Sequence, residues 1–198
     1  TYGDWSSDVC SSDLLMPNLM FLNQGGAKFA NVTMAGRFGL LQKGHAVAFA
    51  DWDNDGDADV FAQMGGAYPG DAFRDAVFAN PGFGNHWLTV QLVGKASNRS
   101  AIGARIRAEI TEDGKRRVVY RHVGSSGSFA GSPLRQTLGL GRCEALHSLE
   151  IFWPRTGKTQ SFANVTFDRA VRITEDTATI EPLRLNVLTP KPATAETK

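Results

Sequence analysis

Apolar and polar residues alternate in short runs along most of the chain, and this alternation predicts β-strands. In residues 104–110, Ile106, Ala108 and Ile110 fall on one face while charged side chains fall on the other. Residues 71–78 fit either a helical turn or a further strand. The chain is therefore expected to be all-β, with strands at 19–22, 28–33, 44–50, 60–61, 87–93, 104–110, 117–123, 134–138, 148–153 and 170–174.

Turn residues join several of these strands into hairpins. The sequence Asn-Gln-Gly-Gly at 23–26 separates the first two strands, and Asp113 with Gly114 supplies the positive φ angles that a two-residue hairpin turn requires. The pentapeptide Phe-Ala-Asn-Val-Thr occurs at 29–33 and again at 162–166. Each copy fits the closing strand of a hairpin, although two strand-favouring pentapeptides can also match by chance.

A domain boundary is expected at residues 80–84, where Asn-Pro-Gly-Phe-Gly interrupts the strand pattern. Acidic residues outnumber basic ones across 15–80, and the reverse holds across 85–180. The first segment has enough short strands for one antiparallel blade, and the second is expected to form a small β-sandwich-like domain. Residues 181–198, which are rich in Pro, Thr, Lys and Ala towards the end, are expected to form a flexible tail.

The N-terminal residues do not fit this pattern. Residues 4–14 resemble the translation of a sequencing adapter that occurs in many metagenomic reading frames, so 1–14 are expected to be an artefact. A natural Ser/Asp-rich linker is the alternative. Once Cys10 is set aside, Cys143 remains, and a single thiol provides neither a disulfide framework nor a metal-type cysteine spacing. For Cys143, a buried structural role is favoured over a reactive thiol.

Charge and hydropathy restrict the partners. The net charge is +1, and no apolar run approaches the roughly 20 residues that span a bilayer, so no membrane span is expected. The basic surplus of the second segment is modest beside the clustered cations of nucleic-acid binders, so no nucleic-acid partner is expected. The arginines and lysine between 99 and 121 fit solvated strand faces, and the alternative is a cationic face towards acidic glycans.

One short segment carries candidate chemistry. Two unit charges about 5 Å apart repel by roughly 3 kcal/mol at an effective dielectric of about 20, so a cluster of carboxylates needs a cation to fold compactly. Calcium accepts six to eight oxygen ligands in a loose geometry and suits such a cluster better than zinc does. A solvated acidic hairpin turn is the alternative. Carboxylates occupy every second position of the segment, at Asp51, Asp53, Asp55, Asp57 and Asp59.

The spacing also restricts the type of calcium loop. Residues 51–56 match the first six positions of an EF-hand loop, but position twelve is Ala62 where an EF-hand requires a glutamate. The flanking residues are strand-like, which also argues against an EF-hand. The shorter ligand set that remains consists of the side chains of Asp51, Asp53 and Asp55, the carbonyl of Asp57, and Asp59 as the closing residue.

The sequence favours no catalytic site. The histidines lack a helical metal-binding spacing, and a surface or packing role is favoured for each of them. Residues 124–128 do not complete a Gly-x-Ser-x-Gly motif, because Ser128 stands where the last Gly would be. Residues 139–144 lack the third Gly of a dinucleotide-binding motif, so a strand-to-turn connection is favoured there.

Two resemblances follow from these motifs. The run Asp-Trp-Asp-Asn-Asp-Gly-Asp-Ala-Asp-Val-Phe at 51–61, with Met-Phe-Leu-Asn at 20–23, resembles the FG-GAP/VCBS repeat of integrin-like β-propellers. The motifs at 85–94, 98–105, 125–129, 138–141 and 149–154 resemble the ASPIC/UnbV domain. This order resembles the cartilage acidic protein family and its bacterial relatives, which are generally secreted or lie at the cell surface.

The resemblance implies a fold and a function. It implies the last blade of a β-propeller followed by a small β-sandwich-like domain, in a C-terminal fragment that lacks N-terminal propeller blades. The implied function is a calcium-stabilised extracellular binding or adhesion module without catalysis, located outside the cell, in the periplasm or at the cell surface. Its implied partner is an extracellular protein or glycan. The alternative is part of a carbohydrate-active enzyme of the polysaccharide lyase type.

Overall fold

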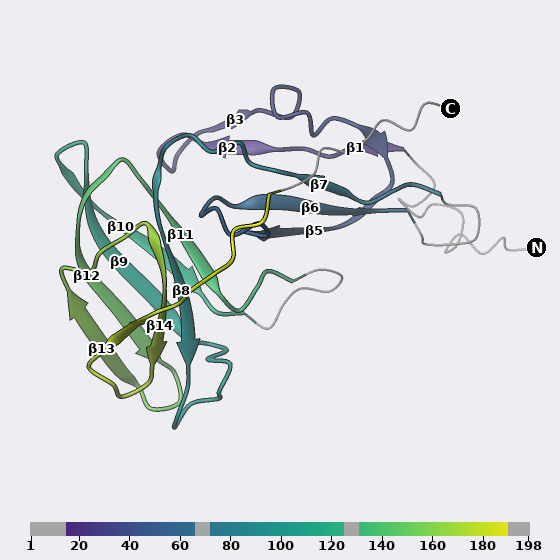
Figure 1. The fold of residues 1–198 in the computed structure, drawn as a ribbon. Helices are drawn as coiled ribbons and strands as arrows, with labels where there is room; N and C mark the ends of the chain where they lie inside the picture. Colours follow the sequence, from purple (N-terminus) through teal and green to yellow (C-terminus); the bar gives the residue numbers. More distant parts are fainter. Residues whose placement is uncertain (1–14, 66–71, 125–130, 190–198) are drawn as a thin grey trace, which may run out of the picture. The chain divides into compact units, whose positions relative to one another are not determined.

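The computed structural model describes residues 15–65, 72–124 and 131–189 (Figure 1). The expected artefact at 1–14 and the end of the expected tail from 190 lie outside these residues, as do the motif residues 125–129. The described residues form β-strands and no helix, which confirms the all-β prediction. Within the same residues, no helix has the length and apolar character that crossing a bilayer would need.

Contacts divide the chain into two units. The first unit comprises the residues up to Ala48 together with Phe61–Phe78, and the second comprises Phe49–Val60 together with the residues from Ala79. The acidic segment 51–59 therefore belongs to the second unit.

The first seven strands form three small sheets. The sheet orders are β1-β4, β2-β3 and β5-β6-β7. The pairing of β1 with β4 is limited to two residues, and Pro17 has no N–H with which to extend it. The strands are β1 (Met16–Pro17), β2 (Phe21–Asn23), β3 (Phe29–Asn31), β4 (Leu41–Gln42), β5 (Gly44–Ala50), β6 (Asp59–Met64) and β7 (Ala76–Phe78).

Many large apolar side chains of the first seven strands are exposed. Val47 and Phe49, which alternation places on one face of β5, are both about half exposed, at 55% and 48%. Other exposed apolar side chains of this region are Phe21, Leu22, Phe29, Leu41 and Val77.

The remaining strands form two four-stranded sheets that share one core, as a β-sandwich does. The sheet orders are β10-β9-β12-β13 and β11-β8-β14-β15 (Figure 1). Strand β8 pairs with β14 in parallel and with β11 in antiparallel orientation. The strands are β8 (His86–Val93), β9 (Arg105–Glu112), β10 (Lys115–His122), β11 (Gln136–Gly141), β12 (Cys143–Trp153), β13 (Lys158–Ala163), β14 (Arg169–Thr174) and β15 (Ile180–Pro182).

The alternation of apolar residues builds the core of this sandwich. Ile106, Ala108 and Ile110 of β9 are completely buried, as predicted. They pack in one cluster with Leu88 and Val90 of the other sheet. Burying aliphatic side chains from both sheets stabilises the domain by roughly 25 cal/mol per Å² of apolar surface removed from water.

Turn chemistry sets the register of the β9–β10 hairpin. Lys115 pairs with Glu112, so Asp113 and Gly114 form a two-residue turn with φ values of 49° and 70°. Positive φ at both positions is the signature of a type I′ turn, whose twist matches that of the flanking strands. The hairpin predicted from the Asp-Gly dipeptide is therefore confirmed.

Several elements differ from the prediction. Within 71–78 the structure has the short strand β7, and the sequence patterns did not predict β15. The two copies of Phe-Ala-Asn-Val-Thr both begin in the closing strand of a hairpin, β3 in one case and β13 in the other. The second copy leaves its strand at Asn164, where φ is 50°.

Candidate metal centre

The acidic segment forms the loop between β5 and β6. Asp51 follows β5 directly, and Asp59 is the first residue of β6. The chain reverses at Asn54 and Gly56, whose φ values are 62° and 100°. Gly tolerates such angles without steric cost and Asn does so more readily than most residues, so this sequence suits a tight loop.

The loop brings three of the five aspartates together. One carboxylate oxygen from each of Asp51, Asp53 and Asp59 lies within 4.8 Å of the others. The three residues are buried, with exposed fractions of 6%, 6% and 3%. Three carboxylates this close and this buried repel one another strongly unless a cation or protons neutralise them.

Hydrogen bonds satisfy one of these carboxylates well and another not at all. Asp59 accepts hydrogen bonds from the N–H groups of Trp52 at 3.2 Å and Asn80 at 2.8 Å. The Asp53 carboxylate accepts a longer one, of 3.4 Å, from the Asp55 N–H. Neither carboxylate oxygen of Asp51 has a hydrogen-bond partner among the described residues, although both are buried. A buried carboxylate without a donor is costly, and a cation would supply the missing partner.

The pKa directions agree with this picture. Burial raises the pKa of Asp51, and the charge of Asp55 adds to the rise, although the nearby Gly56 N–H, whose geometry falls short of a hydrogen bond, and the Arg135 guanidinium act in the opposite direction. Burial also raises the pKa of Asp53, with further contributions from Asp55 and Asp59. A divalent cation would favour the charged forms of these carboxylates and counteract both shifts.

The structure places Asp55 and Asp57 outside the group of three. The Asp55 carboxylate accepts a hydrogen bond of 2.9 Å from the Asp57 N–H, which stiffens the middle of the loop. Burial raises the pKa of Asp57, and the Asp55 charge raises it further. The sequence predicts the Asp57 backbone carbonyl, and not its carboxylate, as a metal ligand. The position of the carboxylate therefore does not test that prediction.

Residues of the second unit outside the loop contact it. The Trp87 indole covers Gly56 so closely that a Cβ atom built there would lie 2.1 Å from Trp87 Cε2. Arg135 donates a hydrogen bond of 2.7 Å to Asn54 Oδ1. The Leu188 N–H donates one of 2.7 Å to the Asp53 carbonyl. The loop thus contacts three other segments of the second unit.

Sequence reasoning missed these supporting residues, because no local signal connects them to the loop. Arg135 lies 81 positions after Asn54, and Asn186, whose carbonyl accepts a hydrogen bond of 2.9 Å from the Asn54 amide, lies 132 positions after it. Such partners are brought together by the path of the chain and leave no spacing to recognise.

The other chemically notable residues have structural partners. His86 Nδ1 lies 2.8 Å from an Asp168 carboxylate oxygen, and His147 Nε2 lies 2.7 Å from the Thr111 hydroxyl. Cys143 is buried, as predicted, and burial raises the pKa of its thiol, which disfavours the reactive thiolate.

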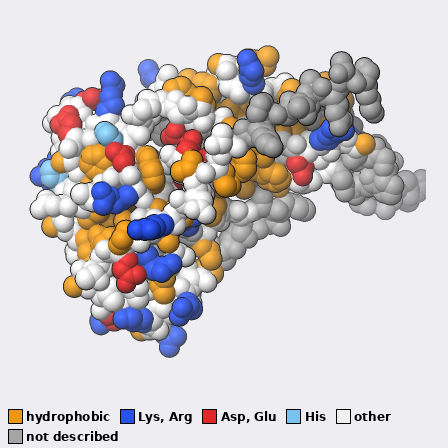
Figure 2. Space-filling view, viewed as in Figure 1, with side chains coloured by type: hydrophobic (Ala, Val, Ile, Leu, Met, Phe, Trp, Pro, Cys, Tyr) orange, Lys and Arg blue, Asp and Glu red, His pale blue; other side chains and the backbone are white. Residues whose placement is uncertain are grey.

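The arginines of β9 and β10 mostly face carboxylates. Arg107 contacts Glu109 and Glu150, and Arg116 also contacts Glu109. On the face that Figure 2 shows, Lys and Arg side chains are mixed with acidic and apolar ones. These strands therefore carry charge networks, as solvated strand faces do.

The fold and the loop define an all-β protein with a buried acidic site ahead of a β-sandwich. Family comparison agrees, since an FG-GAP-like repeat matches residues 2–62 and the ASPIC and UnbV family matches residues 94–180. The chain therefore carries an FG-GAP-like repeat, a unit of propeller-blade origin, followed by an ASPIC/UnbV domain. The acidic loop lies inside the first match and strands β9 to β14 inside the second. No curated protein matches the chain.

Proposed function

We propose that this chain is a calcium-stabilised extracellular binding or adhesion module in which the metal holds a loop and performs no catalysis. The observation that carries the proposal is the buried group Asp51, Asp53 and Asp59, in which both oxygens of Asp51 lack a hydrogen-bond partner among the described residues. A hard cation removes both the repulsion and the unmet acceptor at the same time.

The donor set favours calcium over other divalent ions. Every side-chain donor in the group is a carboxylate oxygen, which argues against zinc sites built from nitrogen and sulfur. Magnesium demands near-ideal octahedral geometry, whereas calcium tolerates irregular loops and recruits backbone carbonyls. The full ligand set proposed is the three buried carboxylates, the Asp55 carboxylate and the Asp57 carbonyl.

The burial of the site supports a structural role. The three carboxylates that would hold the ion are at most 6% exposed, so the loop would enclose the ion on the protein side and leave a substrate little access to it. A catalytic metal keeps an open position for its substrate or a reactive water. The metal is therefore proposed to fix the loop against the sandwich.

The exposed apolar faces of the first seven strands support the rest of the proposal. Blades of a propeller cover one another, and side chains such as Phe21, Phe29 and Leu41 would be covered by neighbouring blades. We propose that such blades belong to the natural protein, that it acts outside the cell, and that its partner is an extracellular protein or glycan.

Calorimetric titration of calcium into the whole chain tests the metal site. One saturable site is expected, and it should be lost in Asp53→Asn, which removes a buried carboxylate from the group. The matched control is Asp113→Asn, which removes an exposed carboxylate at a turn position with φ of 49° that Asn readily adopts. Absence of binding, or equal binding by both variants, would refute the calcium site.

A further inference from the structure

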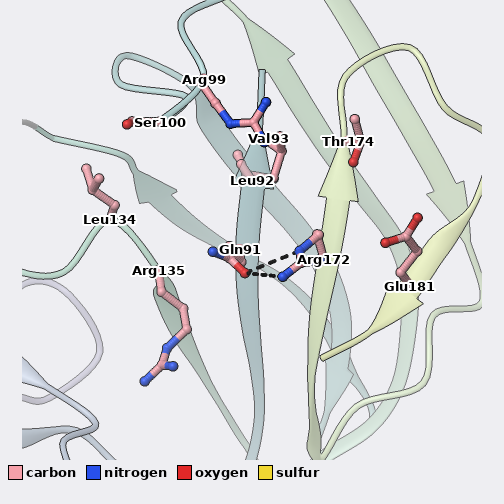
Figure 3. Close-up of a pocket in the computed structure, with 10 residues that line it drawn as sticks. All are labelled: Gln91, Leu92, Val93, Arg99, Ser100, Leu134, Arg135, Arg172, Thr174 and Glu181. Carbon is pink, nitrogen blue, oxygen red and sulfur yellow. Dashed lines mark hydrogen bonds between the residues drawn. The ribbon is translucent and has the colours of Figure 1, made fainter. Parts of the chain in front are cut away.

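A groove lies on the outer face of the sheet β11-β8-β14-β15. Its volume is about 580 Å³, within the range of small-molecule sites, and its lining includes three arginines and one carboxylate (Figure 3). These residues are Arg99, Arg135, Arg172 and Glu181. The groove therefore carries an excess of positive charge.

Strand register arranges part of this lining as a row across the sheet. Gln91 of β8 pairs with Arg172 of β14, and Arg172 pairs with Glu181 of β15. Arg135 directly precedes β11 and adjoins the same row, so Gln91 lies between two arginines (Figure 3). The two arginine backbones are separated by two inter-strand spacings, or about 10 Å.

The charge of these arginines is not neutralised within the described part of the chain. None of Arg99, Arg135 and Arg172 forms an ion pair there, in contrast to Arg107 and Arg116 on the other sheet. Arg172 makes two long contacts of 3.4 Å to the Gln91 amide oxygen, and Arg135 donates to Asn54. Arg172 thus contacts a neutral acceptor and Arg99 forms no ion pair among the described residues, so both keep their charge for a ligand, whereas the Arg135 guanidinium is directed towards the acidic loop (Figure 3).

We infer that this groove binds an acidic oligosaccharide through its carboxylate or sulfate groups. Arginine offers a planar fork of donors that matches such anions in a bidentate geometry. The inference rests on the binding module proposed above and names the chemical class of its ligand.

The other polar groups of the groove favour a sugar over an acidic peptide. The Gln91 amide and the Thr174 hydroxyl can each donate and accept, as the ring hydroxyls of a sugar require. Glu181 can accept hydrogen bonds from ring hydroxyls, which the carboxylates of an acidic peptide cannot supply. No aromatic side chain is among the described residues that line the groove, so the ligand is held by charge and hydrogen bonds.

The experiment is a calorimetric titration of the whole chain, with calcium present and at constant salt. Four probes are compared: a sulfated oligosaccharide, an oligogalacturonate, a neutral maltooligosaccharide and an oligoglutamate peptide. Binding of one or both acidic sugars, without binding of the neutral sugar, is the expected result. The first two probes distinguish sulfate from carboxylate as the recognised group.

The test variant is Arg99→Gln with Arg172→Gln, because both side chains are exposed and neither contacts the acidic loop. The control is a double variant of two exposed residues away from the groove, Arg155→Gln with Lys158→Gln, which removes the same charge. Affinity for the acidic sugar should fall by about tenfold or more in the test variant, as expected from losing charge-assisted hydrogen bonds, and little in the control.

Three results would overturn the inference: no binding of either acidic sugar, binding of the peptide alone, or equal losses in the two double variants. In a separate experiment, calcium is titrated into the same proteins after a chelator has removed bound metal. If the parent protein binds calcium but no acidic sugar, the ligand class is rejected and the proposed metal site stands. If the parent binds an acidic sugar but no calcium, the metal site is rejected.

Discussion

At the scale of single residues, the three buried aspartates differ in how the protein satisfies them. Asp59 is held by two backbone N–H groups, whereas Asp51 has no donor among the described residues. Asp59 is therefore built into the fold with or without a metal, while Asp51 is the residue whose stability depends most on a cation. This difference gives the two residues separable roles.

The first prediction concerns Asp51→Asn. In calcium-free buffer the variant should be more stable than the parent by about 1 kcal/mol, because it removes a buried charge and adds a donor beside two carboxylates. Calcium should raise the unfolding midpoint of the parent and have little effect on the variant. Urea unfolding with and without a chelator measures both effects. A variant less stable than the parent in chelator would show that Asp51 has a favourable partner without metal.

The sequence predicted this site in outline. Alternate aspartates with a central Gly indicated a metal loop at 51–59, but spacing alone does not distinguish the carboxylates that meet from those that do not. That distinction depends on the positive φ at Asn54 and on donors as distant as Asn80. Long-range contacts of this kind leave no periodic trace in the sequence.

At the scale of elements, the close approach of the loop to β8 requires a glycine. Gly56 has a φ of 100°, and the Trp87 indole occupies the space where a Cβ would lie. The second prediction is that Gly56→Ala loses about 2 kcal/mol or more of stability and binds calcium more weakly, since backbone strain adds to the displacement of the ring. Urea unfolding and calcium titration measure the two effects.

The control for this prediction is Gly114→Ala in the β9–β10 turn. Gly114 also has a positive φ, of 70°, but no atom lies within 4 Å of its built Cβ. This variant should lose stability through backbone strain alone and keep its calcium affinity. Unchanged calcium binding in Gly56→Ala would show that the contact with Trp87 does not shape the metal site.

The buried Glu175 fastens the loop between β8 and β9 to the end of β14. Its carboxylate accepts hydrogen bonds from the N–H groups of Lys95 and Ser97, at 2.8 and 2.7 Å, and from the Ser97 hydroxyl at 2.9 Å. Burial alone would raise the pKa of Glu175, but these hydrogen bonds outweigh it and hold the pKa below its ordinary value. The ionised form is therefore favoured in the folded protein.

The third prediction follows from the sign of that shift. A carboxyl group whose pKa is lowered by folding contributes stability above its unfolded pKa, and this contribution is lost as the pH falls through the lowered value. Glu175→Gln should cost roughly 1.5–3 kcal/mol at neutral pH and weaken the pH dependence below the usual glutamate range. Urea midpoints from neutral to acidic pH measure this, with exposed Asp176→Asn as the control. Parallel pH curves for Glu175→Gln and the parent would contradict the prediction.

Strands were easier to predict than their partners. The buried alternation of β9 and the Asp-Gly turn after it are local signals, and both gave the correct structure. For the first seven strands the sequence predicted strands but not their pairing, because short apolar runs do not specify which runs pair. The parallel pairing of β8 with β14 joins strands about eighty residues apart, and no local sequence pattern predicts it.

At the scale of the whole molecule, the family boundaries and the contacts divide the chain differently. The acidic loop belongs to the FG-GAP-like repeat by sequence, but its contacts group it with the strands of the sandwich. A metal bound in this loop would therefore stabilise the unit that contains the ASPIC/UnbV domain. A ligand that binds the folded loop stabilises every segment that must be ordered for the loop to be ordered.

The fourth prediction is that calcium slows hydrogen exchange at the Leu188 amide. This N–H donates to the Asp53 carbonyl at 2.7 Å, so its protection requires an ordered loop. The Leu183 amide is the internal control, because it donates to the Ala170 carbonyl in β14 and does not contact the loop. Calcium should protect Leu188 much more than Leu183, and the difference should vanish in Asp53→Asn. Equal protection of both amides in calcium-loaded protein would show that the metal stabilises the domain without acting through the loop.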